Sequence, residues 1–159
     1  MCITKRRKME RRIKTLLVVF SLIMLVMVSC EENNETKISK YNSSDSHNAG
    51  LNCMTCHTQG GEGEGRFEVA GTVYESNRTT TFPNATVRFY SGPNGTGDLK
   101  YTIQVDALGN FYTTEGISFG SGLYVSVEGD QQTNHMPSSL TTGACNSCHG
   151  GQTGKIWTE

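Results

Sequence analysis

The chain has 159 residues, of which 35% are hydrophobic and 18% charged, and its formal net charge is −1. Seven of its 14 Lys/Arg lie in the first 14 positions, so the chain after Cys30 carries seven Lys/Arg against fourteen Asp/Glu, a net charge of −7. This acidic balance excludes a general electrostatic affinity for nucleic acid, and the length after Cys30 is enough for one domain but not for two.

The first thirty residues predict an export signal. A basic segment at 1–14 precedes an apolar run at 15–29, which is shorter than the roughly 20 residues that span a membrane. The stretch VMVSC ending at Cys30 resembles a bacterial lipobox, which implies a signal peptide over 1–29 and lipidation of Cys30. An ordinary signal peptide with an incidental cysteine and an uncleaved anchor helix are the alternatives. We therefore expect an exported protein that is lipid-anchored to the outer membrane or cell surface, or faces the periplasm.

Residues 66–130 predict a β-domain. Alternating apolar residues mark strands within 67–74, 84–90, 99–105, 109–114 and 122–129, and 116–120 is a possible sixth. Turn residues at 91–98 and 106–110, short connections and the absence of helical periodicity favour a mainly β fold, a small antiparallel β-sandwich. The predicted core consists of Phe67, Val69, Val73, Val87, Phe89, Ile103, Val105, Phe111, Val125 and Val127.

The same segment resembles the carboxypeptidase-regulatory-like (transthyretin-like) β-sandwich family. The resemblance lies in four short motifs, at Gly71/Val73, Pro83/Ala85–Val87, Asp106/Gly109/Phe111 and Gly122/Tyr124/Val125. The family implies a scaffold without catalytic activity. The sequence also lacks a Ser/His/Asp set, a carboxylate pair in contrasting surroundings and a phosphate-binding loop, so we expect no enzyme activity.

Two similar cysteine motifs flank the predicted sandwich, CMTCH at 53–57 and CNSCH at 145–149. Four thiolates could bind zinc, but zinc would leave His57 and His149 unexplained, and exported chains rarely keep thiols reduced. A redox dithiol of the thioredoxin type opens a helix after an apolar strand, and neither motif has that context. Structural disulfides are a further alternative.

The histidine that follows each second cysteine favours covalent haem. In C-x-x-C-H, two thiols add across the two vinyl groups of one porphyrin, and the next imidazole becomes an axial ligand of the iron. Two copies in one exported chain resemble a dihaem c-type cytochrome, without the usual small helical fold. This resemblance implies two covalently bound haems c, held by thioethers from Cys53, Cys56, Cys145 and Cys148, with His57 and His149 as proximal ligands.

The remaining two histidines are candidates for the distal ligands. His47 and His135 each precede one motif, in sequence rich in Gly, Ser and Asn, and they predict two bis-histidine haems. Met136 is the rival distal ligand, and its thioether would raise the potential of the haem. Alternatively, both histidines are solvated loop residues. Which distal residue serves which haem is open, and so is exchange between neighbouring molecules.

The expected domain plan is a flexible tether at 30–46, an N-terminal haem segment at 47–65, the sandwich at 66–130 and a C-terminal haem segment at 131–159. Filled axial positions favour extracytoplasmic electron transfer. The expected partners are redox proteins or neighbouring cytochromes, and the lipid anchor binds the membrane. We expect no nucleic acid partner, and a homo-oligomer or filament is an option. The alternatives are an exported β-sandwich module with disulfides or a metal site, or the haem subunit of a larger oxidoreductase.

The number of strands bears on the distance between the two haem motifs. An even number of up-and-down strands returns the chain to the end that it left. An odd number separates the motifs by the length of a strand, about 20 Å. With five expected strands and a possible sixth, the sequence leaves both arrangements open.

Overall fold

The computed structural model describes residues 36–150 and 154–159. The predicted signal peptide, Cys30 and the first residues of the expected tether therefore lie outside the described residues. Within the described ranges, no helix is long and apolar enough to cross a bilayer.

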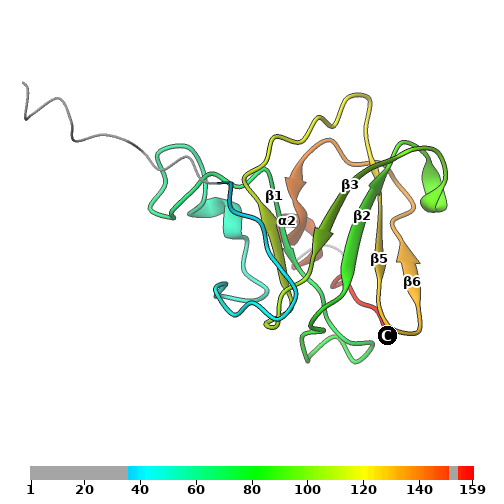
Figure 1. Cartoon of the computed structure of the whole chain (residues 1–159), viewed down its shortest axis with the longest axis horizontal. Coiled ribbons are helices and arrows are strands. Elements are labelled where there is room, and N and C mark those ends of the chain that lie inside the picture. Colours follow the sequence, from blue (N-terminus) through cyan, green and yellow to red (C-terminus); the bar gives the residue numbers. More distant parts are fainter. Residues whose placement is uncertain (1–35, 151–153) are drawn as a thin grey trace, which may run out of the picture. The chain divides into compact units, whose positions relative to one another are not determined.

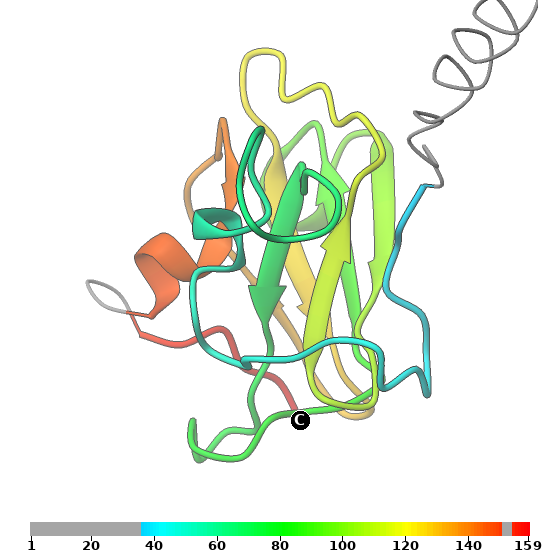
Figure 2. The same cartoon turned by 90° about the vertical axis from the view of Figure 1, so that its left-hand side faces the viewer.

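Two β-sheets face each other and form a sandwich (Figures 1 and 2). The first sheet has the order β4-β1-β7, with β1 at Val69–Thr72, β4 at Asn110–Thr113 and β7 at Gly143–Ala144. The second has the order β3-β2-β5-β6, formed by β2 (Thr86–Tyr90), β3 (Leu99–Gln104), β5 (Tyr124–Glu128) and β6 (Thr133–His135). All pairs are antiparallel except β1 with β7. The predicted fold class, a mainly β protein with a small sandwich, is confirmed.

Three short helices complete the described structure: η1 (Cys53–Thr55), η2 (Pro93–Gly95) and α2 (Cys145–His149). The first covers the start of the first cysteine motif, and the third covers the whole of the second. The second lies in the turn between β2 and β3, on the side of the second sheet that faces away from the first (Figure 1).

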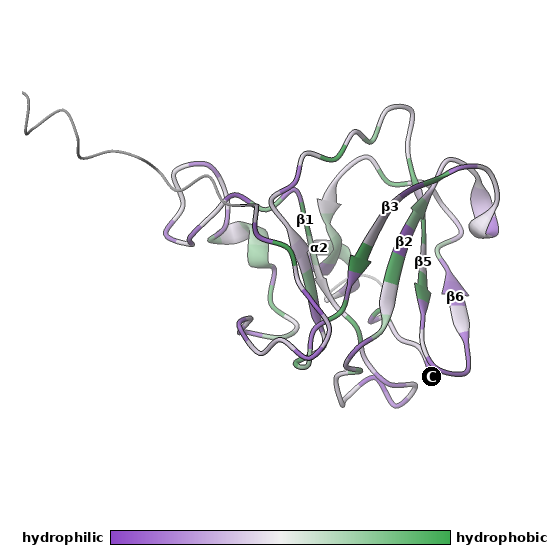
Figure 3. Ribbon diagram, viewed as in Figure 1, coloured by the Kyte–Doolittle hydropathy of each residue, from purple (hydrophilic) through white to green (hydrophobic). Residues whose placement is uncertain are grey.

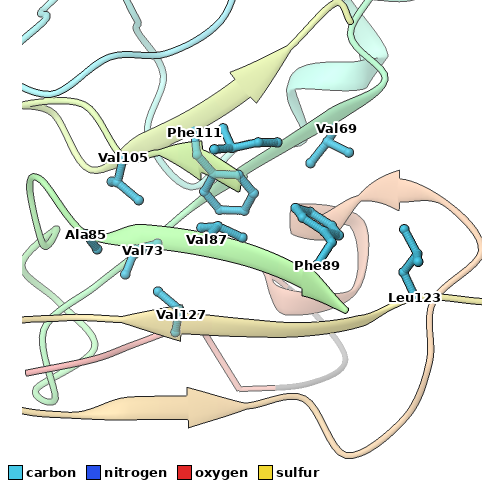
Figure 4. Packing of buried hydrophobic residues seen from close by; sticks show 10 residues of the cluster. Val69, Val73, Ala85, Val87, Phe89, Val105, Phe111, Leu123 and Val127 are labelled. Carbon is cyan, nitrogen blue, oxygen red and sulfur yellow. The ribbon is translucent and has the colours of Figure 1, made fainter. Parts of the chain in front are cut away.

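The core fills the space between the sheets with side chains from alternate strand positions. Phe89 and Val87 of β2 point toward Phe111 of β4 and Val69 of β1 (Figure 4), and the strand interiors are the apolar parts of the ribbon (Figure 3). Most predicted core residues belong to this cluster. Phe67 is buried elsewhere, and Val125 is only half-buried. The observed cluster comprises Val69, Val73, Ala85, Val87, Phe89, Ile103, Val105, Phe111, Leu123 and Val127.

The sandwich extends beyond the predicted limits of 66–130. Strands β6 and β7 lie in the segment 131–159, whereas 116–120, the possible sixth strand, contains no strand. The expected tether is shorter than 30–46, because its chain packs on the sandwich from Lys37 onward. Ser39 is 2% exposed and donates a hydrogen bond to the Gln104 carbonyl (2.6 Å), and Ile38 forms a β-bridge with Thr113. Polar residues in this segment bind backbone groups of the sandwich, which composition alone does not reveal.

The C-terminal residues connect the two sheets. The Tyr74 N–H donates to the Ile156 carbonyl (2.9 Å), and the Thr158 N–H donates to the Tyr74 carbonyl (3.0 Å). The Thr158 hydroxyl donates to the Gln132 carbonyl (2.7 Å), just before β6. Residues 156–159 thus bind the end of β1 in the first sheet and the start of β6 in the second.

Candidate functional site

Each cysteine motif forms one helical turn. In the first, the Asn52 side chain accepts a hydrogen bond from the Met54 N–H, and the His57 N–H donates to the Cys53 carbonyl (2.9 Å). In the second, α2 begins at Cys145 and ends at His149. Residues three and four apart in a helical turn lie on one face. The two cysteines and the histidine of each motif are therefore presented together.

Both motif histidines are oriented through Nδ1. The Nδ1 of His57 lies 3.0 Å from the Glu64 carbonyl oxygen, and that of His149 lies 2.7 Å from the Gly154 carbonyl oxygen. A carbonyl accepts only, so the proton is on Nδ1 and the lone pair is on Nε2. This backbone contact is typical of metal-bound histidine, because it fixes the tautomer and the ring orientation.

The glycine-rich loop after the first motif shapes the pocket around His57. The imidazole ring of His57 stacks on the ring of Phe67, with centroids 4.0 Å apart and planes within 6°. On another side, a Cβ atom at Gly63 would lie 2.7 Å from Nδ1 of His57. Any other residue at position 63 would push the imidazole or the loop aside.

Replacing Gly63 with alanine is therefore expected to displace the His57 ring and weaken its contact with the Glu64 carbonyl. If His57 ligates a haem iron, as the sequence predicts, that ligation should weaken with it, visible as a high-spin fraction in the absorption spectrum of the purified protein. Gly60→Ala is the matched control, because a Cβ atom there has no neighbour within 4 Å. Gly60, unlike Gly63, has a positive φ angle, at 74°, so backbone strain would add to the cost of the control variant only. A low-spin spectrum in Gly63→Ala equal to that of Gly60→Ala would contradict the assigned role.

A cavity of about 570 Å³ adjoins the first motif on the outer face of the first sheet. Tyr112 and Asn110 of β4 point to this face, opposite to the core residue Phe111. The predicted distal residue His47 lines the same cavity, and its ring centroid lies 5.9 Å from that of His57. Two imidazoles that share one metal at bonds of about 2.0–2.1 Å place their rings roughly 6 Å apart. The structure thus brings His47 to the first motif.

A second cavity, of about 310 Å³, adjoins the second motif and opens between the two sheets. Cys145, Cys148 and His149 line one side of it, and Met136 lines another. The walls are formed largely by apolar side chains that face the inside of the sandwich, among them Val125. Its place on this cavity explains why it is only half-buried. Both cavities have volumes within the range of ligand sites, roughly 300–1,000 Å³.

The two motifs lie next to each other beside β1 (Figures 1 and 2). Strand β7 is parallel to β1, so strand direction alone would place the motifs at opposite ends. Segment 50–57, however, runs back along β1. Gly50 donates to the hydroxyl of Thr72 at the end of the strand (2.9 Å), and the His57 carbonyl accepts from the Phe67 N–H before its start (3.0 Å).

A buried polar cluster joins the motifs. Asn146, inside the second motif, donates to the Leu51 carbonyl before the first motif (2.9 Å) and to the Thr72 hydroxyl (3.0 Å). Its side-chain oxygen accepts from the Thr72 N–H (3.1 Å). The Thr72 hydroxyl donates to Asn110 (2.7 Å), whose amide donates to the Ser46 hydroxyl next to His47 (2.9 Å). Three side chains thus connect the first motif, the second motif and the His47 segment.

The thiol of the first cysteine in each motif is poorly suited to thiol–disulfide chemistry. Burial, with smaller contributions from the nearby Cys148 and Cys53 thiols, raises the pKa of Cys145 to about 12. Burial also raises the pKa of Cys53. Redox dithiols depend on a lowered thiol pKa. Among residues 36–150 and 154–159, no three His, Cys, Asp or Glu side chains are placed to share a metal ion.

No protein-family model, curated protein or solved structure matches this chain. The resemblances to c-type cytochromes, to lipoproteins and to the transthyretin-like family therefore rest on the residues quoted above.

Proposed function

We propose that this protein is an exported dihaem c-type cytochrome, lipid-anchored through Cys30, that transfers electrons outside the cytoplasm. One observation carries the proposal. Each C-x-x-C-H segment forms a turn whose histidine has its lone pair on Nε2, and each turn borders a cavity that also contains a second possible axial ligand. A bound haem supplies reversible one-electron exchange at its iron, and the sandwich holds the residues that bind it.

Residue by residue, the chain fits two haems. Cys53 and Cys56 would form the thioethers at the first cavity, with His57 as the proximal ligand. Cys145, Cys148 and His149 would serve the second cavity in the same way. In each attachment the thiol hydrogen and sulfur add across one vinyl double bond, so no external oxidant is required.

The placement of basic residues supports an anionic cofactor. The chain after Cys30 has seven Lys/Arg, and two of them, Arg78 and Lys155, line the second cavity, which none of the described Asp or Glu residues lines. Lys37 lines the first cavity, where it pairs with Glu64 (2.6 Å). Cations at these positions can pair with the two propionates that each haem carries, inside an otherwise acidic protein.

The adjacency of the motifs supports electron exchange within one chain. Phe111 lines both cavities, and the Cys53 thiol is near enough to influence the pKa of Cys145. Cofactors held there would be close neighbours, so an electron could enter at one haem and leave from the other. Two filled axial positions suit an electron carrier rather than an enzyme. Redox proteins or further cytochromes, including copies of this chain, are the expected partners.

The test is to count covalent haems in the full-length protein exported from a host that makes c-type cytochromes. Pyridine haemochrome spectra and intact mass should give two haems per chain in the wild type. The double variants Cys53→Ala/Cys56→Ala and Cys145→Ala/Cys148→Ala should each retain one. No haem, with zinc or disulfides in its place, would refute the proposal in favour of a structural surface module. Copurification with a catalytic subunit would instead indicate the haem subunit of an oxidoreductase.

A further inference from the structure

The pairing of β5 with β6 determines which side chains reach the second cavity. Val127 is opposite Asn134, and Ser126 is opposite His135. The register continues one residue further, because the Met136 N–H donates to the Val125 carbonyl (2.8 Å). Residues directly opposite each other in a sheet point to the same face, and neighbours in one strand point to opposite faces. Met136 therefore shares the face of Val125 and Val127, which line the cavity.

His135 belongs to the other face. Its partner Ser126 is opposite Arg88 of β2, whose neighbours Val87 and Phe89 point into the core. The His135 ring lies against Gly95 of η2, where a Cβ atom would be 3.2 Å from its Cε1. His135 borders the cavity, because it lies between Asn134 and Met136, but its imidazole is on the outer side of the sheet.

The surroundings of Met136 suit a thioether ligand. Val87, Val125 and Leu140 are among the apolar walls of the second cavity, which also contains the motif histidine His149. The sulfur of a thioether is a soft metal ligand, and it is so weakly polar that its burial requires no hydrogen-bond partner. The first cavity differs, because it is lined by polar groups of residues 45–48 and contains the imidazole of His47.

We infer that the two haem sites have different axial ligands: His57 with His47 at the first, and His149 with Met136 at the second. This assignment rests on the proposed function and replaces the symmetrical bis-histidine arrangement. Methionine–histidine ligation raises the reduction potential of a haem relative to bis-histidine ligation. An electron would therefore pass from the first haem, which is oxidised, to the second, which is reduced. Electron transfer between the two motifs would therefore have a preferred direction, from the first haem to the second.

Four single variants of the full-length, haem-loaded protein test the assignment. The ferric wild type should show the far-red charge-transfer band of a methionine-ligated haem and two separate steps in a redox titration. Met136→Leu should abolish the band and make one haem high-spin. Met136→His should abolish the band, keep both haems low-spin and lower the higher of the two potentials. His47→Ala should make the other haem high-spin and retain the band.

His135→Ala is the matched control, because it alters the neighbouring residue on the opposite face. It should change neither the band nor the potentials. The inference is overturned if His135→Ala makes a haem high-spin, or if Met136→Leu leaves the spectrum unchanged. Haem content is measured separately in every sample. Two covalent haems without a methionine band would refute the ligand assignment and leave the proposed function standing. A wild-type protein that contains no covalent haem would refute both.

Discussion

Replacing Asn146 with alanine is expected to lower the free energy of unfolding by about 2–4 kcal/mol, because its loss leaves the Leu51 carbonyl and the Thr72 N–H without their partner. A buried polar group that loses its hydrogen bond costs roughly 1–3 kcal/mol. Asn146 is 7% exposed and makes all three of its hydrogen bonds across long sequence separations. Chemical denaturation followed by far-ultraviolet circular dichroism measures the change.

The same substitution should loosen the relative placement of the two proposed haems. The bisignate Soret circular dichroism of neighbouring haems is expected to weaken in Asn146→Ala while the haem content stays at two. Ser147→Ala is the matched control, since Ser147 is the other residue between the cysteines and its exposed hydroxyl donates locally, to the carbonyl of Ala144 just before the motif. Equal stability and equal Soret signals in the two variants would show that Asn146 does not link the motifs.

Truncation of Phe111 to alanine should have the largest effect on stability, a loss of about 3–5 kcal/mol. The side chain is 1% exposed within the core cluster, and the residue borders both cavities. Domains of this size are stable by roughly 5–15 kcal/mol, so the variant should unfold at markedly lower denaturant concentration. The midpoint and slope of the urea transition provide the measurement.

Two further substitutions test whether the lost stability comes from the buried apolar volume of Phe111. Phe111→Leu retains most of the apolar volume, so it should lose less stability than Phe111→Ala. Leu108→Ala removes a side chain that is 40% exposed in the preceding turn and should change stability by less than about 0.5 kcal/mol. If Phe111→Ala were no less stable than Leu108→Ala, the assigned role of Phe111 in the core would be wrong.

The central strands could be predicted from the sequence because their apolar side chains alternate. Val87 and Phe89 of β2 and Ile103 of β3 follow this period, and each is buried as expected. Strands β6 and β7 could not be predicted in this way. Thr133–His135 is polar, and Gly143–Ala144 has only two residues, so both strands depend on pairing with β5 and β1 and not on a pattern of their own.

The two C-x-x-C-H motifs stand out in the sequence and carry the haem prediction, whereas the surroundings of the motifs could not be predicted. The C-x-x-C-H spacing identifies six of the proposed haem-binding residues, four thioether cysteines and two proximal histidines, but nothing in the sequence shows that Asn146 meets Leu51 across 95 positions. The choice between His135 and Met136 depended on knowing that 133–135 is a strand in a defined register. Once that register is known, the alternation of side chains separates the two neighbours.

The strand count proved a poor guide to the distance between the motifs. It assumes that each motif lies where its nearest strand begins or ends. Residues 50–57 instead run back beside β1, held by Thr72 at one end and Phe67 at the other. A connection that folds back along its own strand cancels the separation that strand direction would impose.

The short strand β7 has a consequence for the order of assembly. Gly143 approaches β1 so closely that a Cβ atom would lie 2.0 Å from the Glu68 carbonyl oxygen, and Cys145 follows two residues later. Once this contact has formed, the Cys145 thiol is withdrawn from solvent and its pKa is raised to about 12. Under the proposed function, cofactor attachment at the second motif would therefore precede the closure of β7 onto β1 during biosynthesis. With only two residue pairs to β1, this strand is suited to be the last part of the fold to form.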